Sequence, residues 1–192
     1  MLDFSAIVIS SSVVALAEMG DKTQLLSLML AARYPKQAGP IIGGILLATL
    51  LNHAGAALVG HWLADLLSPN VMQWILGVGF LLIGLWLLIP DRLDDTKEQK
   101  VANRGWQVFV FTTTIFFLAE MGDKTQIATI ALGARYDSVT SVTLGTTLGM
   151  MLANIPAVWL GRKFTERLPI QVVHAIAAVV FIGLGVVTLI FA

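Results

Sequence analysis

Six long apolar stretches constrain this chain more than any other feature of its sequence. They cover approximately residues 4–31, 39–62, 70–89, 106–133, 139–161 and 170–191. A transmembrane helix needs roughly 20 mostly apolar residues to cross about 30 Å of hydrocarbon. Only 12% of the 192 residues are charged, against about 25% in soluble domains. The sequence therefore predicts an all-α integral membrane protein with six transmembrane helices, and it excludes soluble and disordered chains.

The basic residues of the loops predict how these helices are oriented. Nine lysines and arginines follow the first, third and fifth spans, whereas the opposite side has only Arg135. Loops rich in lysine and arginine stay in the cytoplasm, so we expect both termini on the outer face of a cytoplasmic (inner) membrane. No signal-peptide pattern precedes the first span. The nine residues are Arg33, Lys36, Arg92, Lys97, Lys100, Arg104, Arg162, Lys163 and Arg167.

A nine-residue segment, LAEMGDKTQ, occurs twice, at Leu16–Gln24 and at Leu118–Gln126, 102 residues apart. Each copy begins a set of three predicted spans. Because three is an odd number, the second set must enter the membrane from the opposite side. We therefore expect two inverted three-helix repeats, 1–90 and 106–192, joined by a charged cytoplasmic linker at 91–105. Secondary transporters use such repeats and bind their cargo near the midplane between them.

Charged residues of the repeated segment fall inside predicted membrane spans, where each one costs at least about 2.5–3.5 kcal/mol on insertion scales. We expect the glutamate and aspartate of each copy, three residues apart, to share a helix face in a wet cavity lined by protein. Together the six groups carry a net charge of −2, which one divalent cation or two protons would neutralise. They are Glu18, Asp21 and Lys22 in the first copy, and Glu120, Asp123 and Lys124 in the second.

Neutral oxygen atoms near these acids complete the predicted metal site, because hard divalent cations prefer several oxygen ligands. The candidates are Thr23, Gln24, Asn52, Thr125, Gln126 and Asn154. The two asparagines occupy equivalent positions and are equally well explained as hydrogen bonds between helices. Gly20 and Gly122 lie between the acids, and we expect them to loosen the helix or admit another backbone. With Lys22 and Lys124 they are assigned to motif charge and gating.

Whether Met19, Met121 or His53 also binds the metal stays open at this point. Met19 and Met121 could offer a thioether to Mn²⁺, although an apolar contact is favoured, and His53 lies beside Asn52 but corresponds to Ile155 in the second half. An alternative interpretation treats Glu18–Lys22 and Glu120–Lys124, each four residues apart, as salt bridges that only join helices.

The motif Glu-x-Gly-Asp-Lys-Thr, present twice, resembles the signature ExGD[KR][ST] of a family of small cation/proton exchangers. That family includes manganese and calcium transporters of the Golgi and chloroplast and bacterial manganese exporters, which this chain resembles most. The resemblance implies export of Mn²⁺, or of Ca²⁺, in exchange for protons, with the metal ion, protons and the lipid bilayer as partners and the oligomeric state left open. It implies no enzyme activity, no cofactor and no nucleic acid.

Two other functions are consistent with an intramembrane cluster of acids. A passive cation channel or a sodium-coupled carrier would also need carboxylates inside the membrane. An intramembrane aspartyl protease would need the pattern Gly-x-Gly-Asp, and Glu18 stands where its first glycine should be. The sequence therefore favours a transporter over an enzyme.

Overall fold

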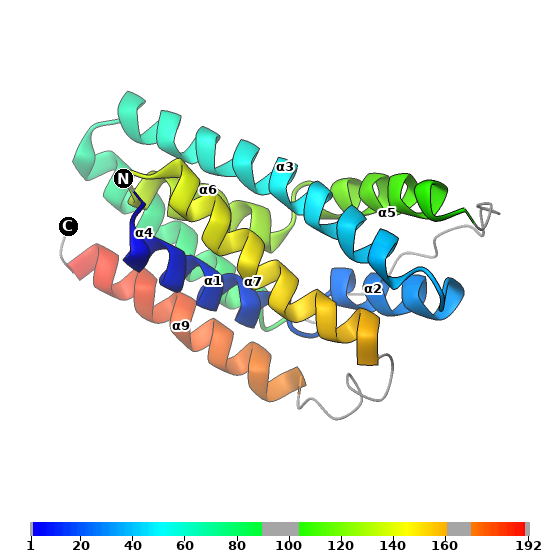
Figure 1. Ribbon diagram of the computed structural model, residues 1–192. Coiled ribbons are helices and arrows are strands. Elements are labelled where there is room, and N and C mark those ends of the chain that lie inside the picture. The colour runs from blue at the N-terminus through cyan, green and yellow to red at the C-terminus, as the bar shows by residue number, and fades with distance from the viewer. Residues whose placement is uncertain (1, 90–103, 161–169, 191–192) are drawn as a thin grey trace.

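A computed structural model describes residues 2–89, 104–160 and 170–190 of the chain (Figure 1). These residues form eight α-helices and contain no β-strand. The helices are α1 (Phe4–Glu18), α2 (Lys22–Arg33), α3 (Ala38–Leu66), α4 (Pro69–Trp86), α5 (Gly105–Glu120), α6 (Lys124–Arg135), α7 (Val139–Leu160) and α9 (Ile170–Ile190).

The first and fourth predicted spans are each broken at the repeated motif. Helix α1 ends at Glu18 and α2 begins at Lys22, with a bend of 70° between them. In the second half α5 ends at Glu120 and α6 begins at Lys124. The expectation of continuous helices over 4–31 and 106–133 was wrong, and so was the expectation that each Glu–Asp pair shares a helix face. The cause is glycine: Gly20 has φ of 84° and Gly122 has φ of 75°, a left-handed conformation that ends an α-helix.

Four helices are long and apolar enough to cross a membrane, namely α3, α4, α7 and α9, and the bent pair α1–α2 makes a fifth candidate. Helix α5 is apolar but has only 16 residues. The all-helical class is therefore confirmed for the described residues, and the presence of helices able to span a membrane agrees with the predicted membrane protein. Most of the predicted linker, 91–105, lies outside the described residues, as do six of the nine orienting basic residues: Arg92, Lys97, Lys100, Arg162, Lys163 and Arg167.

Each half of the chain packs its motif helices on the long helix of the other half. Helices α1 and α2 lie on α7, and α5 and α6 lie on α3. Glycines permit these close approaches: a methyl group added at Gly149 would come within 2.5 Å of the backbone of Ser11, and one at Gly133 within 2.5 Å of the backbone of Ala57. Because α3 and α7 also contact each other, both helix breaks lie around one shared centre.

Helices α4 and α9 form a pair that covers one end of this arrangement (Figure 1). The rings of Phe80 and Phe181 lie 6.1 Å apart between them, and Gln73 donates a hydrogen bond to the carbonyl of Thr188 at 3.0 Å. Helix α9 packs on α1 and α4 packs on α6, whereas α2 and α5 have no comparable cover from this pair. The last helices of the two repeats, α4 and α9, therefore pack differently against the motif helices.

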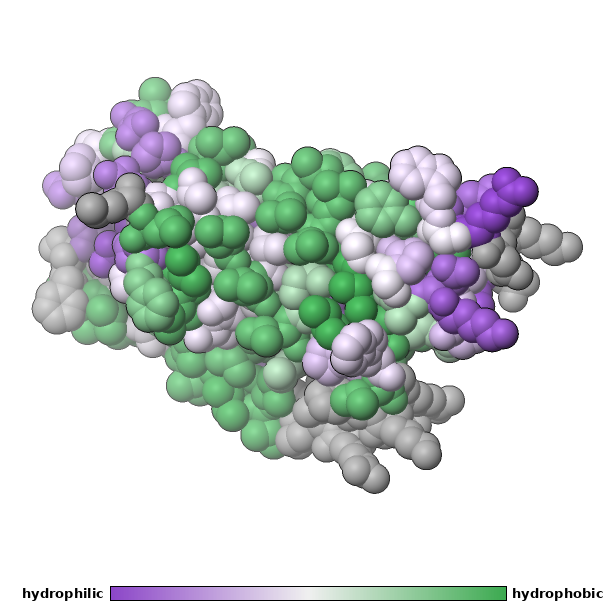
Figure 2. Space-filling model, in the orientation of Figure 1, coloured by the Kyte–Doolittle hydropathy of each residue, from purple (hydrophilic) through white to green (hydrophobic). Residues whose placement is uncertain are grey.

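The face of the molecule shown in Figure 2 is apolar over its middle and polar toward both ends. Large apolar side chains are exposed on the molecule, among them Trp62, Leu82 and Trp159. A soluble protein would rarely expose so much contiguous apolar surface, and in a bilayer the same surface contacts lipid. The interior holds the polar groups instead, including the motif carboxylates.

Candidate metal site

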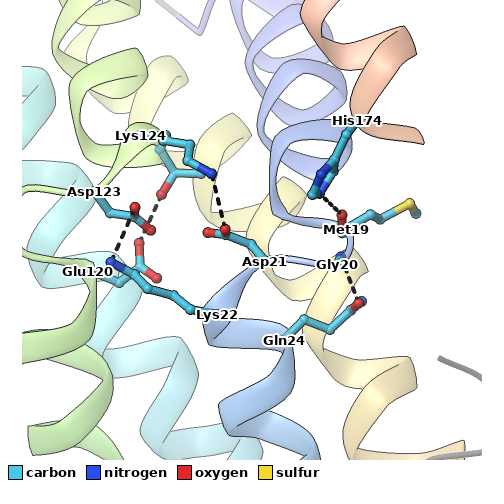
Figure 3. Close-up of polar contacts among 10 residues, drawn as sticks. Met19, Gly20, Asp21, Lys22, Gln24, Glu120, Asp123, Lys124 and His174 are labelled. Carbon is cyan, nitrogen blue, oxygen red and sulfur yellow. Dashed lines mark hydrogen bonds and ion pairs between the residues drawn. The ribbon is translucent and has the colours of Figure 1, made fainter. Parts of the chain in front are cut away.

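The two broken motifs lie side by side near the centre of the molecule, where Asp21 and Lys22 of one copy face Asp123 and Lys124 of the other (Figure 3). Each break places its aspartate at the N-cap position, directly before the second helix. The two helix breaks therefore bring together corresponding residues of the two motif copies, which are 102 residues apart in sequence.

The motif glutamines fix the shape of the two breaks. Gln24 accepts a hydrogen bond from the backbone N–H of Gly20 at 2.9 Å, and Gln126 accepts one from Gly122 at 2.7 Å. The Gln24 amide also donates to the carbonyl of Ala153 on α7 at 2.9 Å. The Oε1 atoms of both glutamines therefore each accept a hydrogen bond from the backbone of their own break.

Reciprocal ion pairs join the two copies. Lys22 Nζ lies 3.2 Å from Asp123 Oδ1, and Lys124 Nζ lies 3.5 Å from Asp21 Oδ1. The alternative interpretation paired each lysine with the glutamate of its own copy. These contacts run between copies instead, because the helix break turns residue i+4 away from the place it would occupy on a continuous helix.

All four motif carboxylates are buried, with no more than 2% of any of them exposed. Glu120 accepts a hydrogen bond from Thr125 Oγ1 at 3.0 Å, and Thr23 lies beside it from the other copy. Both oxygens of Glu18, Oε1 of Glu120 and Oδ2 of Asp123 accept no hydrogen bond from the described residues. Glu18 has Asn154 as a polar neighbour and lies close enough to the other three acids to interact with them electrostatically.

The two asparagines of the equivalent positions make different contacts. Asn52 donates to the carbonyl of Phe117 on α5 at 3.0 Å. Asn154 accepts a hydrogen bond from Ser27 at 2.6 Å and donates to the carbonyl of Met150 at 3.0 Å. Both asparagines therefore make hydrogen bonds to other helices, and Asn154 does so beside Glu18.

Neither methionine of the motif is aimed at the ion pairs. The thioether of Met19 points away from them (Figure 3), and 57% of Met121 is exposed. His53 is fully buried, and neither of its ring nitrogens has a hydrogen-bond partner among the described residues.

Three residues near the site were not singled out from the sequence. His174 on α9 places Nε2 2.8 Å from the carbonyl of Met19 in the first break. Trp86 at the end of α4 lies with its ring centroid 5.9 Å from Lys124 Nζ. Ser27 is the third, and its counterpart Thr129 is also a hydroxyl residue. The repeat could have pointed to Ser27, whereas nothing in the sequence places His174 or Trp86.

No three Asp, Glu, His or Cys side chains within the described ranges are grouped so that they could hold a metal ion. The motif carboxylates are instead interleaved with the two lysines, which occupy two of their oxygens. In this conformation two of the four carboxylates are paired with lysines, and the described residues do not form a cage ready for a cation.

Comparison with known proteins matches this chain to a single family. The sequence profile described as "Divalent cation/proton antiporter GDT1" matches residues 6–95 and 108–192. A Vibrio cholerae protein named "Putative manganese exporter" is 50% identical over 188 residues, covering 97% of this chain and 92% of that protein. A GDT1-like protein of Synechocystis is 29% identical, covering 91% of this chain and 92% of its own length. No solved structure matches the chain.

The two halves of the profile match contain one broken motif each, and the match leaves out only the first few residues and part of the linker. The transport and antiport functions expected from the motif are thereby confirmed at the level of the family. The chain belongs to the GDT1 family of divalent cation/proton antiporters.

Proposed function

We propose that this chain exports Mn²⁺ in exchange for protons, with Ca²⁺ as the alternative cargo. The observation that carries the proposal is the cluster of buried carboxylates contributed by both motif copies: Glu18, Asp21, Glu120 and Asp123. Several of their oxygens accept no hydrogen bond, and an unsatisfied buried carboxylate is costly unless a cation or a proton neutralises it.

The charge of the cluster suits an exchange of one divalent cation for two protons. Four carboxylates and two ammonium groups sum to −2, so the cluster is neutral either with one divalent cation bound or with two protons bound. Since a neutral cluster costs least inside the membrane, the carrier changes its accessible side in these two states only. Thr23 and Thr125 would supply neutral oxygens, and the asparagines and glutamines would hold the helices around the ion.

The proposed architecture is six membrane spans in two inverted three-span halves, with the site near the midplane. The sequence offset supports it, as do the reciprocal contacts of α1 and α2 with α7 and of α5 and α6 with α3. Two of the spans are then bent pairs, α1–α2 and α5–α6. Broken helices of this kind present their ends to the cargo in secondary transporters. We place both termini on the outer face of the inner membrane, and the charged linker in the cytoplasm.

The choice of Mn²⁺ draws on the name of the Vibrio cholerae relative, which describes a manganese exporter. The ligands available are oxygens, which suit Mn²⁺ and Ca²⁺ alike, and the methionines that could favour the softer ion point elsewhere. A panel of Mn²⁺, Ca²⁺, Fe²⁺ and Mg²⁺, tested singly in liposomes under one fixed pH gradient, decides between them. We expect Mn²⁺ to be moved fastest, and faster movement of Ca²⁺ would reverse the assignment.

The test of the exchange uses purified protein in liposomes with an imposed pH gradient and no Mn²⁺ gradient. We expect Mn²⁺ to accumulate on the acidic side while that side loses protons. A passive channel would not accumulate the ion, and a sodium-coupled carrier would respond to a Na⁺ gradient in place of the pH gradient.

The site is tested by the double variant Glu18→Gln with Glu120→Gln, which removes two charges and keeps the side-chain volume. We expect it to abolish the coupled movement. Asp137→Asn is the matched control, because that carboxylate is 99% exposed at the far end of α6, and it should transport normally. Coupled transport by the double variant would show that the glutamates are not the site.

A further inference from the structure

We propose that Lys22 is a tethered cation that takes the place of the metal: it neutralises Asp123 in the unloaded carrier, and the arriving divalent cation displaces it. This inference rests on the proposed function, since it assigns Asp123 to the metal site. It gives the motif lysine a part in the exchange beyond joining two helices.

The geometry of the ion pair carries the first step. Lys22 reaches from the start of α2 to Asp123 at the start of α6, so its ammonium stands on a carboxylate of the other motif copy at 3.2 Å. Only Oδ1 of Asp123 is engaged, and Oδ2 accepts no hydrogen bond. The contact is a single ammonium–oxygen pair, and such a point-charge contact can be exchanged for a metal ion at the same oxygen.

The absence of a ready-made cage in the described residues supports the second step. The acids lie together, yet no three of them are placed to bind a metal ion. The two lysines lie among these acids and hold Asp21 and Asp123. A divalent cation that takes Oδ1 of Asp21 or of Asp123 as a ligand must therefore displace the lysine that holds that oxygen.

The two lysines are not equally able to leave. The side chain of Lys22 is 28% exposed, whereas that of Lys124 is 1% exposed and lies against the ring of Trp86. This difference follows from the unequal packing of the fold, because α4 packs on α6, whereas α9 makes no comparable contact with α2 among the described residues. The partly exposed Lys22 has room to move its ammonium off Asp123, whereas moving Lys124 breaks its cation–π contact with Trp86.

The exchange that follows needs no change in the charge of the lysine. Lys22 stays an ammonium ion throughout, leaves Asp123 when the metal binds and returns when the metal departs. While Lys22 is paired with Asp123, that carboxylate cannot bind a second cation and is not left without a counter-charge. The lysine thereby weakens metal binding and speeds metal release.

The test measures Mn²⁺ binding to purified protein in detergent at alkaline pH, by the loss of the electron paramagnetic resonance signal of free Mn²⁺. The variants are Lys22→Gln, Lys124→Gln and Lys22→Arg, with Lys36→Gln as the control that removes an exposed lysine outside the motif. We expect Lys22→Gln to bind Mn²⁺ roughly tenfold tighter, since one buried charge neighbour is worth at least that much. Lys36→Gln should bind like the wild type.

The other variants separate this role from a structural one. Lys22→Arg keeps the charge and should bind within about twofold of the wild type, and Lys124→Gln should gain less than Lys22→Gln. In liposomes Lys22→Gln should lower both KM and the maximal rate, because a tightly held metal leaves slowly. A purely structural lysine would lower only the rate and the thermal stability.

The inference is overturned when Lys22→Gln binds Mn²⁺ no more tightly than the wild type, or when Lys124→Gln shows the larger gain. If Lys22→Gln does not fold, Lys22→Met, which keeps the length of the side chain and removes its charge, replaces it with the same expected and refuting results. A wild-type protein that neither binds nor moves Mn²⁺ refutes the proposed function itself, which is a different result from normal binding with an inert lysine.

Discussion

Gly122 is the position at which a single methyl group tests the broken helix most cleanly. Its φ of 75° lies in the left-handed region, where an alanine costs about 1–2 kcal/mol relative to glycine. A methyl group built on Gly122 meets no atom within 4 Å, so the substitution Gly122→Ala adds backbone strain and no steric clash. We expect it to destabilise the folded protein by about 1–2 kcal/mol, which lowers the folded-to-unfolded ratio roughly 5- to 30-fold.

Gly55 provides the matched control for this substitution. It lies inside α3, it is not among the glycines with positive φ, and its added methyl group also meets no atom within 4 Å. There an alanine should stabilise the helix by about 0.5–1 kcal/mol. The measurements are the thermal unfolding midpoint in detergent and the rate of Mn²⁺ movement in liposomes.

The reasoning predicts that the two alanine variants move the midpoint in opposite directions and that only Gly122→Ala slows transport. If Gly122→Ala were as stable as Gly55→Ala, residue 122 would not have a left-handed conformation. The second half would then contain a continuous helix, and Glu120 and Asp123 would lie on one face of it.

Further predictions concern packing, motion and competition. Gly133→Ala should destabilise the protein by about 1–3 kcal/mol or more and lower its unfolding midpoint, because the methyl group would meet backbone atoms of α3 within 3.0 Å. An unchanged midpoint would contradict the packing of α6 on α3. The chain has no cysteine, so a disulfide cross-link between Met19→Cys and His174→Cys can be made without competition from native thiols. This cross-link should fix α9 to α1 and stop transport until it is reduced. A cross-link between Phe80→Cys and Phe181→Cys joins α4 to α9 and should leave transport intact, because we expect these two helices to move as one body. The opposite pattern of inhibition would contradict that motion. Lowering the pH equally on both sides should weaken Mn²⁺ binding because protons compete for the same carboxylates, and binding that does not depend on pH would contradict the exchange.

The repeated motif was enough to predict which charged residues the fold brings together. Its two identical copies single out the same acids and lysines that the structure brings to one centre. The apolar stretches likewise predicted helices throughout the described residues. These features depend on composition and local pattern, which a sequence records directly.

Three features could not be predicted in this way. The helix breaks occupy only three residues within an apolar stretch, and one glycine with positive φ decides them. The partner of Lys22 lies in the other half of the chain, whereas spacing along a helix suggests Glu18. The cover of Lys124 by Trp86 breaks the symmetry that two equal repeats imply. Each of these depends on tertiary packing between residues far apart in sequence.

The proton count per metal ion tests the exchange most directly, because it follows from the net charge of the four carboxylates and two lysines. Purified protein in liposomes is held at a fixed pH difference while the Mn²⁺ gradient is varied until net Mn²⁺ movement stops. For two protons per Mn²⁺, one pH unit balances an approximately 100-fold Mn²⁺ gradient, since each proton contributes about tenfold, and a membrane potential does not shift the balance point. A balance point near tenfold, or one that ignores the pH difference, would contradict a neutral cluster that carries either one divalent cation or two protons.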